Sequence, residues 1–116
     1  GDQNRFEQML EDQSTIEKAS KLITELSGQK DAQSQNQLAR WVATKESHAS
    51  AVQNTIADYF MAQRIKSSDS KYEDKLTKAH AVIVAAMKCK QSVDAKNASS
   101  LKEAILSFHK AYEKKK

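Results

Sequence analysis

The fold of this chain is decided by residues 40–66, RWVATKESHASAVQNTIADYFMAQRIK. Apolar side chains recur through this stretch every three or four residues, which is the spacing of a helix packed in a bundle. Starting just before it, they are Leu38, Val42, Ala49, Val52, Ile56 and Tyr59. Lys45 falls in the gap of this seam, and His48 lies one turn beyond it. Because burial disfavours the charged form of either side chain, we expect a partner carboxylate nearby.

The composition agrees with a helical chain. The 116 residues contain no proline and two glycines, which removes the residues that most often interrupt helices and makes a sheet architecture improbable. A chain of this length buries enough surface for one core, so we predict a single domain over residues 1–116.

Start and stop signals predict four helices. The first runs from about Asp2 to Ser27, with Gly28 as a permissive stop. Capping boxes, in which a serine precedes a glutamate or glutamine by three residues, predict the other three starts. The pairs are Ser34 with Gln37, Ser70 with Glu73, and Ser100 with Glu103. The second helix continues to Lys66, and the third ends at about Gln91.

Each predicted helix has one apolar side that needs a partner. These sides consist of Phe6, Met9, Ile16, Leu22, Ile23 and Leu26 in the first helix, Tyr72, Leu76, Ala79, Ile83 and Met87 in the third, and Leu101, Ile105, Phe108 and Tyr112 in the fourth. The connections at residues 29–33, 67–69 and 92–99 are short enough to favour antiparallel neighbours. We therefore predict an all-α fold, an antiparallel up-down-up-down four-helix bundle.

The histidines and the cysteine give little support for a metal site. No two of His48, His80 and His109 have the spacing that places two ligands on one helical face. His80, on the apolar side of its helix, is interpreted as a hydrogen-bonded core residue, and His109 as a surface residue. Cys89 lies between two lysines, but a lone cysteine on a helix is more often a small packing residue than a redox thiol.

Charge and hydropathy limit the classes of partner that the chain could bind. The net charge of +4 is spread over solvated faces without interleaved aromatic residues, so nucleic-acid binding is disfavoured, although a diffuse positive potential favours the arrival of small anions. The longest apolar run, residues 79–87, is far shorter than the roughly 20 residues that span a bilayer. No export leader opens the sequence, and one cysteine cannot form an internal disulfide, so we expect a cytoplasmic protein.

The residues resemble a known family. The chain contains a series of short motifs in a fixed order. They are Arg40-Trp41-Val42, Lys45-Glu46, His48-Ala49, Tyr59-Phe60, Gln63-Arg64-Ile65-Lys66 and Ala85-Ala86-Met87-Lys88. In order and spacing they are similar to the helical body of nickel superoxide dismutases, and the likeness covers nearly the whole chain. The resemblance implies a four-helix protomer, a homohexamer, and an enzyme that disproportionates superoxide to oxygen and hydrogen peroxide.

The resemblance also implies a nickel cofactor held by an N-terminal hook, His-Cys-x-x-Pro-Cys-Gly-x-Tyr, through the terminal amine, a backbone amide, two thiolates and the histidine ring. Thiolate ligation would bring the redox couple of nickel into a useful range, which oxygen or nitrogen ligands alone would not readily do. These 116 residues contain no hook, since the first cysteine is Cys89 and the first histidine is His48. Arg5-Phe6-Glu7 looks like the Arg-x-Glu that follows the hook in the family.

We therefore expect no catalytic residue and no metal ligand within these residues, and no dismutation by this polypeptide alone. A shortened chain, a processed terminus and a natural hookless relative would look alike. The alternative is a non-enzymatic helical module for assembly or partner binding.

Three residues match positions around the hook. Glu7 matches the glutamate that hydrogen-bonds the axial histidine, and His48 stands where many members have an arginine, so that contact would carry a titratable charge here. Tyr59 matches the tyrosine of the family's Asp-Tyr-Phe, although Met61 replaces the usual lysine. The residues alone allow a structural alternative for each. Glu7 would be an acid favoured by the helix dipole in the first turn, His48 would pair with a carboxylate in the seam, and Tyr59 would be a core residue.

Overall fold

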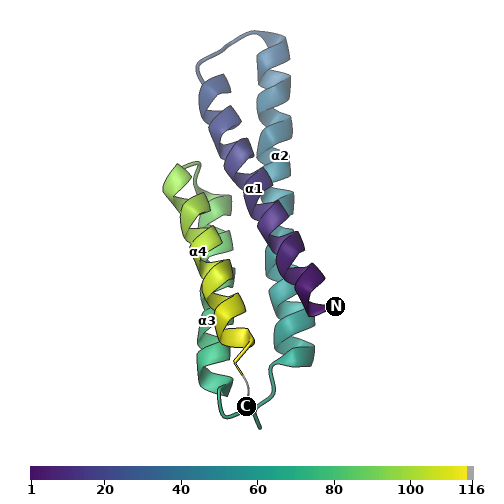
Figure 1. The fold of residues 1–116 in the computed structure, drawn as a ribbon. Coiled ribbons are helices and arrows are strands. Elements are labelled where there is room, and N and C mark those ends of the chain that lie inside the picture. The colour runs from purple at the N-terminus through teal and green to yellow at the C-terminus, as the bar shows by residue number, and fades with distance from the viewer. Residues whose placement is uncertain (115–116) are drawn as a thin grey trace.

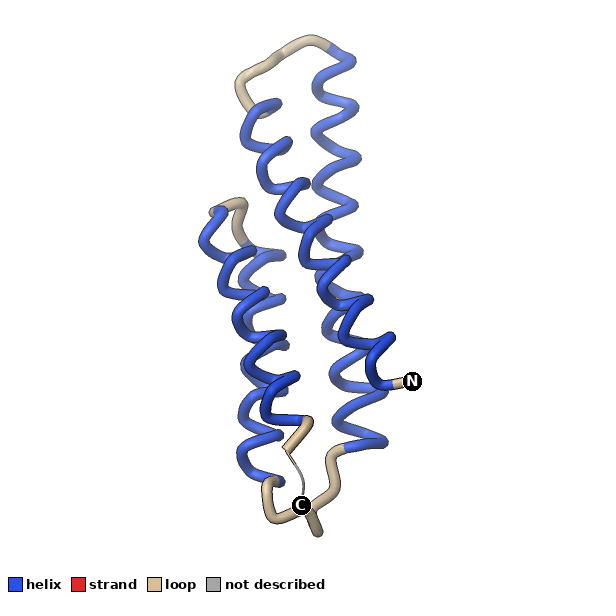
Figure 2. The backbone as a smooth tube through the Cα atoms, viewed as in Figure 1, coloured by secondary structure: helices blue, strands red, loops and turns tan. Residues whose placement is uncertain are grey.

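Four helical rods run antiparallel, and the computed structural model describes residues 1–114 (Figure 1). The elements are α1 (Asp2–Leu26), α2 (Ala32–Asn54), its continuation η1 (Thr55–Arg64), α3 (Tyr72–Gln91) and α4 (Ala95–Tyr112). Helix α1 packs on α2 and α4, and α3 packs on α2 and α4, so neighbours in the chain are neighbours in space. Within the described residues Figure 2 shows helices and loops and no strand. The predicted all-α up-down-up-down bundle is confirmed.

The two hairpins differ in length. In Figure 1 the α1–α2 hairpin extends well past the end of the α3–α4 hairpin, which makes the molecule a rod of 57 × 22 × 18 Å. None of the described helices combines the length and the apolar character that a membrane span requires.

The core follows the predicted apolar faces with two exceptions. Its largest fully buried side chains are Phe6, Phe60, Phe108, Met9, Ile16, Ile56, Leu101 and Ile105. In contrast, Val42 is 41% exposed and Met87 is 42% exposed, so the predicted seams of α2 and α3 are wrong at these positions. Helix α3 turns Val82 and Ala86 inward instead of Met87.

The end of the second rod is a π-helix, which changes the register of its side chains. In η1 the Ile65 N–H donates to Phe60 O at 2.8 Å, a bond that spans five residues instead of four. Phe60, four residues after Ile56, lies on the same face of the rod and is fully buried, whereas Tyr59 is half-buried at the edge of the core. The predicted seam included Tyr59 and missed Phe60.

The start of α2 differs from the predicted capping box. Asp31 is the N-cap, and its side chain accepts a hydrogen bond from Ser34 N at 3.1 Å. The predicted cap, Ser34, instead donates its hydroxyl to Gln29 Oε1 at 2.7 Å. Aspartate caps a helix as well as serine does, and here it comes first in the chain.

The same competition moves the start of α4. Asp94 is the N-cap and accepts from Lys96 N at 2.9 Å, so the helix begins before the predicted cap Ser100. The connection from α3 to α4 is therefore residues 92–94 and not 92–99.

Helix α3 begins at Tyr72 without a side-chain cap, so Ser70 does not cap it. The preceding turn is instead held by Asp69, which accepts from Lys71 N at 2.8 Å and pairs with the buried Lys75 Nζ at 2.6 Å. The prediction had the right number of helices and the wrong capping residues.

Helix α1 ends close to the predicted residue, but its C-cap differs from the predicted glycine stop. Ser27 is its C-cap and donates its N–H to Ile23 O at 3.0 Å. Gly28 does not adopt a positive φ, so the left-handed stop expected of a glycine does not occur.

Lys45 is buried as predicted, but its partners are not carboxylates. Its ammonium group donates to the backbone oxygens of Cys89, of Lys90 at 3.0 Å and of Ser92 at 3.3 Å. These carbonyls end α3, where oxygens lack partners within the helix and carry partial negative charge. The end of a helix therefore supplies what we expected from an acidic side chain, and Lys45 ties α2 to the α3–α4 turn.

Candidate functional site

The structure places Glu7, His48 and Tyr59 in three different environments. Glu7 is exposed on α1, His48 is half-exposed on α2, and Tyr59 is half-buried on η1. Among residues 1–114 no hydrogen bond or ion pair joins any two of them. Their roles around a metal hook stay predictions.

His48 has the partner carboxylate that the sequence analysis expected. Its Nδ1 lies 2.8 Å from Asp12 Oδ1, and the Asp12 side chain is almost fully buried. Gln8 Nε2 donates to the same carboxylate oxygen at 3.4 Å. A buried carboxylate needs such donors, so Asp12 fixes the orientation of the imidazole ring.

The other two histidines lie outside this arrangement. His80 is exposed, so the interpretation of a core histidine is wrong; α3 buries the preceding residue, Ala79, in its place. His109, interpreted as a surface residue, is half-buried, because its ring stacks on Phe6 at 4.0 Å between centroids and its Nε2 pairs with Glu113 at 3.0 Å.

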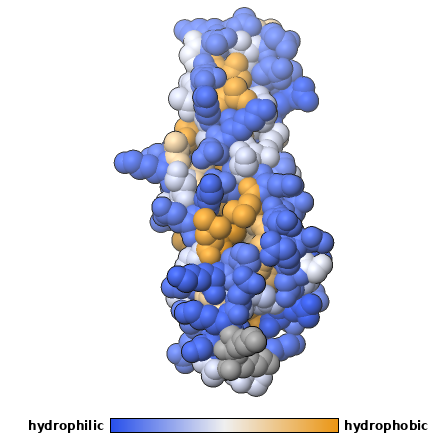
Figure 3. All heavy atoms as spheres, in the orientation of Figure 1, coloured by the Kyte–Doolittle hydropathy of each residue, from blue (hydrophilic) through white to orange (hydrophobic). Residues whose placement is uncertain are grey.

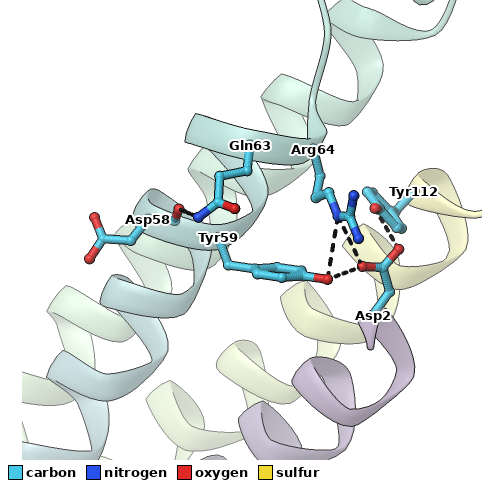
Figure 4. A network of polar contacts seen from close by, with 6 residues as sticks. All are labelled: Asp2, Asp58, Tyr59, Gln63, Arg64 and Tyr112. Carbon is cyan, nitrogen blue, oxygen red and sulfur yellow. Dashed lines mark hydrogen bonds and ion pairs between the residues drawn. The ribbon is translucent and has the colours of Figure 1, made fainter.

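Tyr59 belongs to a polar cluster at the first turn of α1, drawn in Figure 4. One carboxylate, that of Asp2, accepts from the hydroxyls of Tyr59 and, at 2.8 Å, Tyr112. Arg64 Nε lies 3.3 Å from Asp2 Oδ1 and 3.4 Å from the Tyr59 hydroxyl. The cluster therefore joins the start of α1 to η1 and to the last turn of α4.

Sequence analysis missed three of these four side chains. The π-helix is the reason for Arg64, since a five-residue separation from Tyr59 matches a π turn and not an α turn. Asp2 and Tyr112 lie 110 positions apart, and nothing local in the sequence indicates that the two ends of the chain meet.

Electrostatics within the cluster favour a charged Asp2 and a neutral Tyr112. The hydrogen bond from Tyr59, followed by that from Tyr112 and by the charge of Arg64, lowers the pKa of Asp2 despite some desolvation. Burial, together with the bond to Asp2, raises the pKa of the Tyr112 hydroxyl well above its usual range. The guanidinium groups of Arg5 and Arg64 lie over the Tyr59 ring, 4.4 and 5.4 Å from its centroid.

Replacing Asp2 by asparagine is expected to lower the free energy of unfolding at neutral pH by only about 0.5 kcal/mol, because the groups are partly exposed and screened. The folded-state pKa of Asp2 lies below the ordinary value of 3.8. Its contribution is thus complete above that value and is lost as the pH falls through the lower folded pKa. Urea denaturation should show the wild type and D2N converging in acid; a constant difference at every pH would contradict the assignment.

The side chains of this chain do not fit a thiolate nickel site. No group of three or more histidine, cysteine or acidic residues within residues 1–114 is arranged to hold a metal ion. Cys89 is buried, its Sγ lies 3.4 Å from Asn97 O, and burial raises its thiol pKa, which disfavours the thiolate that a metal requires. Its interpretation as a packing residue agrees with this burial.

A larger hollow lies away from the cluster. A cavity of about 920 Å³ runs between the C-terminal half of α1 and the α3–α4 turn, lined by Lys18, Lys21, Thr24, Val93 and others. A smaller one, of about 290 Å³, opens beside the cluster and is lined by Arg5, Tyr59 and Gln63 among others. The smaller cavity shares the Tyr59 side chain with the cluster, whereas Asp2, Arg64 and Tyr112 do not line it.

Comparison with known proteins identifies a family for this chain. A family model described as nickel-containing superoxide dismutase matches residues 1–116. No curated protein and no solved structure matches the chain.

Proposed function

Because this chain belongs to the nickel-containing superoxide dismutase family, we propose that its bundle is the scaffold of an enzyme that disproportionates superoxide to oxygen and hydrogen peroxide. The observation that carries the proposal is the match over the entire chain. Nickel would supply the redox chemistry when it is held by a His-Cys-x-x-Pro-Cys hook joined to this bundle. Since residues 1–114 do not fit the metal, we assign no catalytic step to them.

The contribution of the bundle would be to support that hook. Tyr59 is the best placed of the three predicted residues, because it binds Asp2 in the first turn of α1, next to the residue to which a hook would be joined. His48 is held by Asp12 instead, and Glu7 is exposed without a side-chain partner among the described residues, so their roles rest on the resemblance.

Assembly into a homo-oligomer, a hexamer by family resemblance, is part of the proposal. Figure 3 shows apolar atoms exposed among hydrophilic ones on the visible face. The large apolar side chains exposed to solvent are Val42, Val84, Met87, Val93 and Leu106. Contacts between copies would cover such side chains. A cytoplasmic location is proposed because the one cysteine forms no internal disulfide.

The second candidate is a non-enzymatic assembly or partner-binding module. It is favoured by the same exposed apolar side chains, which a partner or a second copy would cover. Under this candidate the bundle would keep its assembly without any need for nickel.

Superoxide decay, followed by stopped-flow absorbance, tests the proposal. We expect the 116 residues alone to leave the spontaneous decay unchanged, and the same residues preceded by the hook and loaded with nickel to accelerate it. A chain whose two hook cysteines are replaced by serine is the matched control and should be inactive. Failure of the nickel-loaded hook chain to accelerate decay would favour the non-enzymatic module, and activity of the bare chain would refute our reading of the site.

A further inference from the structure

Three side chains from other elements contact the Asp2 carboxylate. Its two oxygens are engaged separately, Oδ1 by the Tyr59 hydroxyl and by Arg64 Nε, and Oδ2 by the Tyr112 hydroxyl at 2.8 Å. The three donors belong to η1 and α4, whereas the carboxylate belongs to α1. Figure 4 shows the three side chains pointing toward this one group.

We propose that Tyr59, Arg64 and Tyr112 form a binding site for a small carboxylate anion, and that the Asp2 side chain occupies this site from within the same chain. Formate and acetate are the simplest ligands of this class. The site does not depend on nickel, so it can be tested apart from dismutation.

The donor set favours a carboxylate over other anions. A guanidinium group and two hydroxyls make charge-assisted bonds to carboxylate oxygens, and the two phenols reach different oxygens of one planar group. A spherical anion such as chloride cannot satisfy both phenols in this way. The guanidinium group of Arg5 lies over the Tyr59 ring and adds a second positive charge near the site.

The site is open to solvent, and its donors are separate from its present occupant. The side chains of Arg64 and Asp2 are 49% and 37% exposed. Asp2 lies on α1, whereas the donors lie on η1 and α4, so removal of the Asp2 carboxylate leaves all three donors in the chain.

Affinity for a free anion should be weak but measurable. Formate has so few atoms that the usual limit per atom allows a Kd no tighter than about 1 mM. In the wild type Asp2 competes at an effective concentration in the millimolar range or above, because it is tethered to the site. The site should therefore respond to formate only when the Asp2 carboxylate is removed.

The test is a thermal unfolding titration of Asp2→Ala with sodium formate against sodium chloride at equal ionic strength. For a Kd on the order of 10 mM, 100 mM formate should raise the Tm by roughly 5 °C over the chloride reference. The wild type should show no such difference. If D2A is unfolded at room temperature, the gain of helical circular dichroism in formate over chloride provides the same comparison.

Two variants decide whether the effect belongs to this site. Asp58→Ala is the matched control, because Asp58 is an exposed aspartate of η1 whose carboxylate points away from the cluster in Figure 4. It should behave like the wild type. Adding Arg64→Gln and Tyr112→Phe to D2A should abolish the response. The proposal is overturned if formate and chloride act alike on D2A, if D2A responds to neither, or if D58A responds as D2A does.

Discussion

Replacing Phe60 by alanine is expected to lower the free energy of unfolding by about 3–5 kcal/mol, the range for removing a buried aromatic side chain. Phe60 is fully buried, and its ring centroid lies 4.8 Å from that of Phe6 and 5.1 Å from those of Phe108 and Tyr112. The loss would leave a cavity among rings from η1, α1 and α4, which cannot close without moving all three. Urea denaturation followed by circular dichroism measures it.

Leu106→Ala is the matched control for Phe60. Leu106 is a large apolar residue on α4 but is 46% exposed, so its truncation should change stability by no more than about 0.5 kcal/mol. Equal losses for the two variants would contradict the burial of Phe60 in the core.

Replacing Lys45 by methionine is expected to lower the free energy of unfolding by about 2–3 kcal/mol. Methionine keeps most of the volume but removes the ammonium group that binds the carbonyls of Cys89, Lys90 and Ser92. Hydrogen bonds to a charged group are among the strong ones, and their loss leaves acceptors at the end of α3 without a donor. Hydrogen exchange should also increase at the α3–α4 turn.

Lys88→Met gives the comparison for Lys45, because Lys88 lies on α3 with an exposed side chain. Its replacement should change stability by less than about 0.5 kcal/mol. If K45M proved as stable as the wild type, the ammonium group would not be what ties α2 to the α3–α4 turn.

The fold could be predicted because it depends on repeated, redundant signals. Many apolar positions report the helical period of each rod, so errors at Val42 and Met87 do not change the topology. The caps could not be assigned with the same certainty, since each depends on one residue. Asp31 and Asp94 competed with the nearby serines, and local sequence does not decide between them.

The candidate site was predicted only in part, for a physical reason. Tyr59 was named from the family resemblance, and a carboxylate partner for His48 was expected from the cost of burying a polar group, without identifying Asp12. The contact between Asp2 and Tyr112 depends on how two hairpins of unequal length pack, and that of Arg64 with Tyr59 depends on a π-helix. Neither feature has a local sequence signature.

The nickel content of the bare 116-residue chain tests the central claim most directly, namely that the bundle holds a redox centre whose ligands lie outside the described residues. The chain would be incubated with Ni²⁺, dialysed and analysed for metal beside the hook-bearing chain. We predict retention of nickel by the hook-bearing chain and loss of nickel by the bare chain, whose one thiol, Cys89, is buried. Stoichiometric nickel retained by the bare chain would contradict the account.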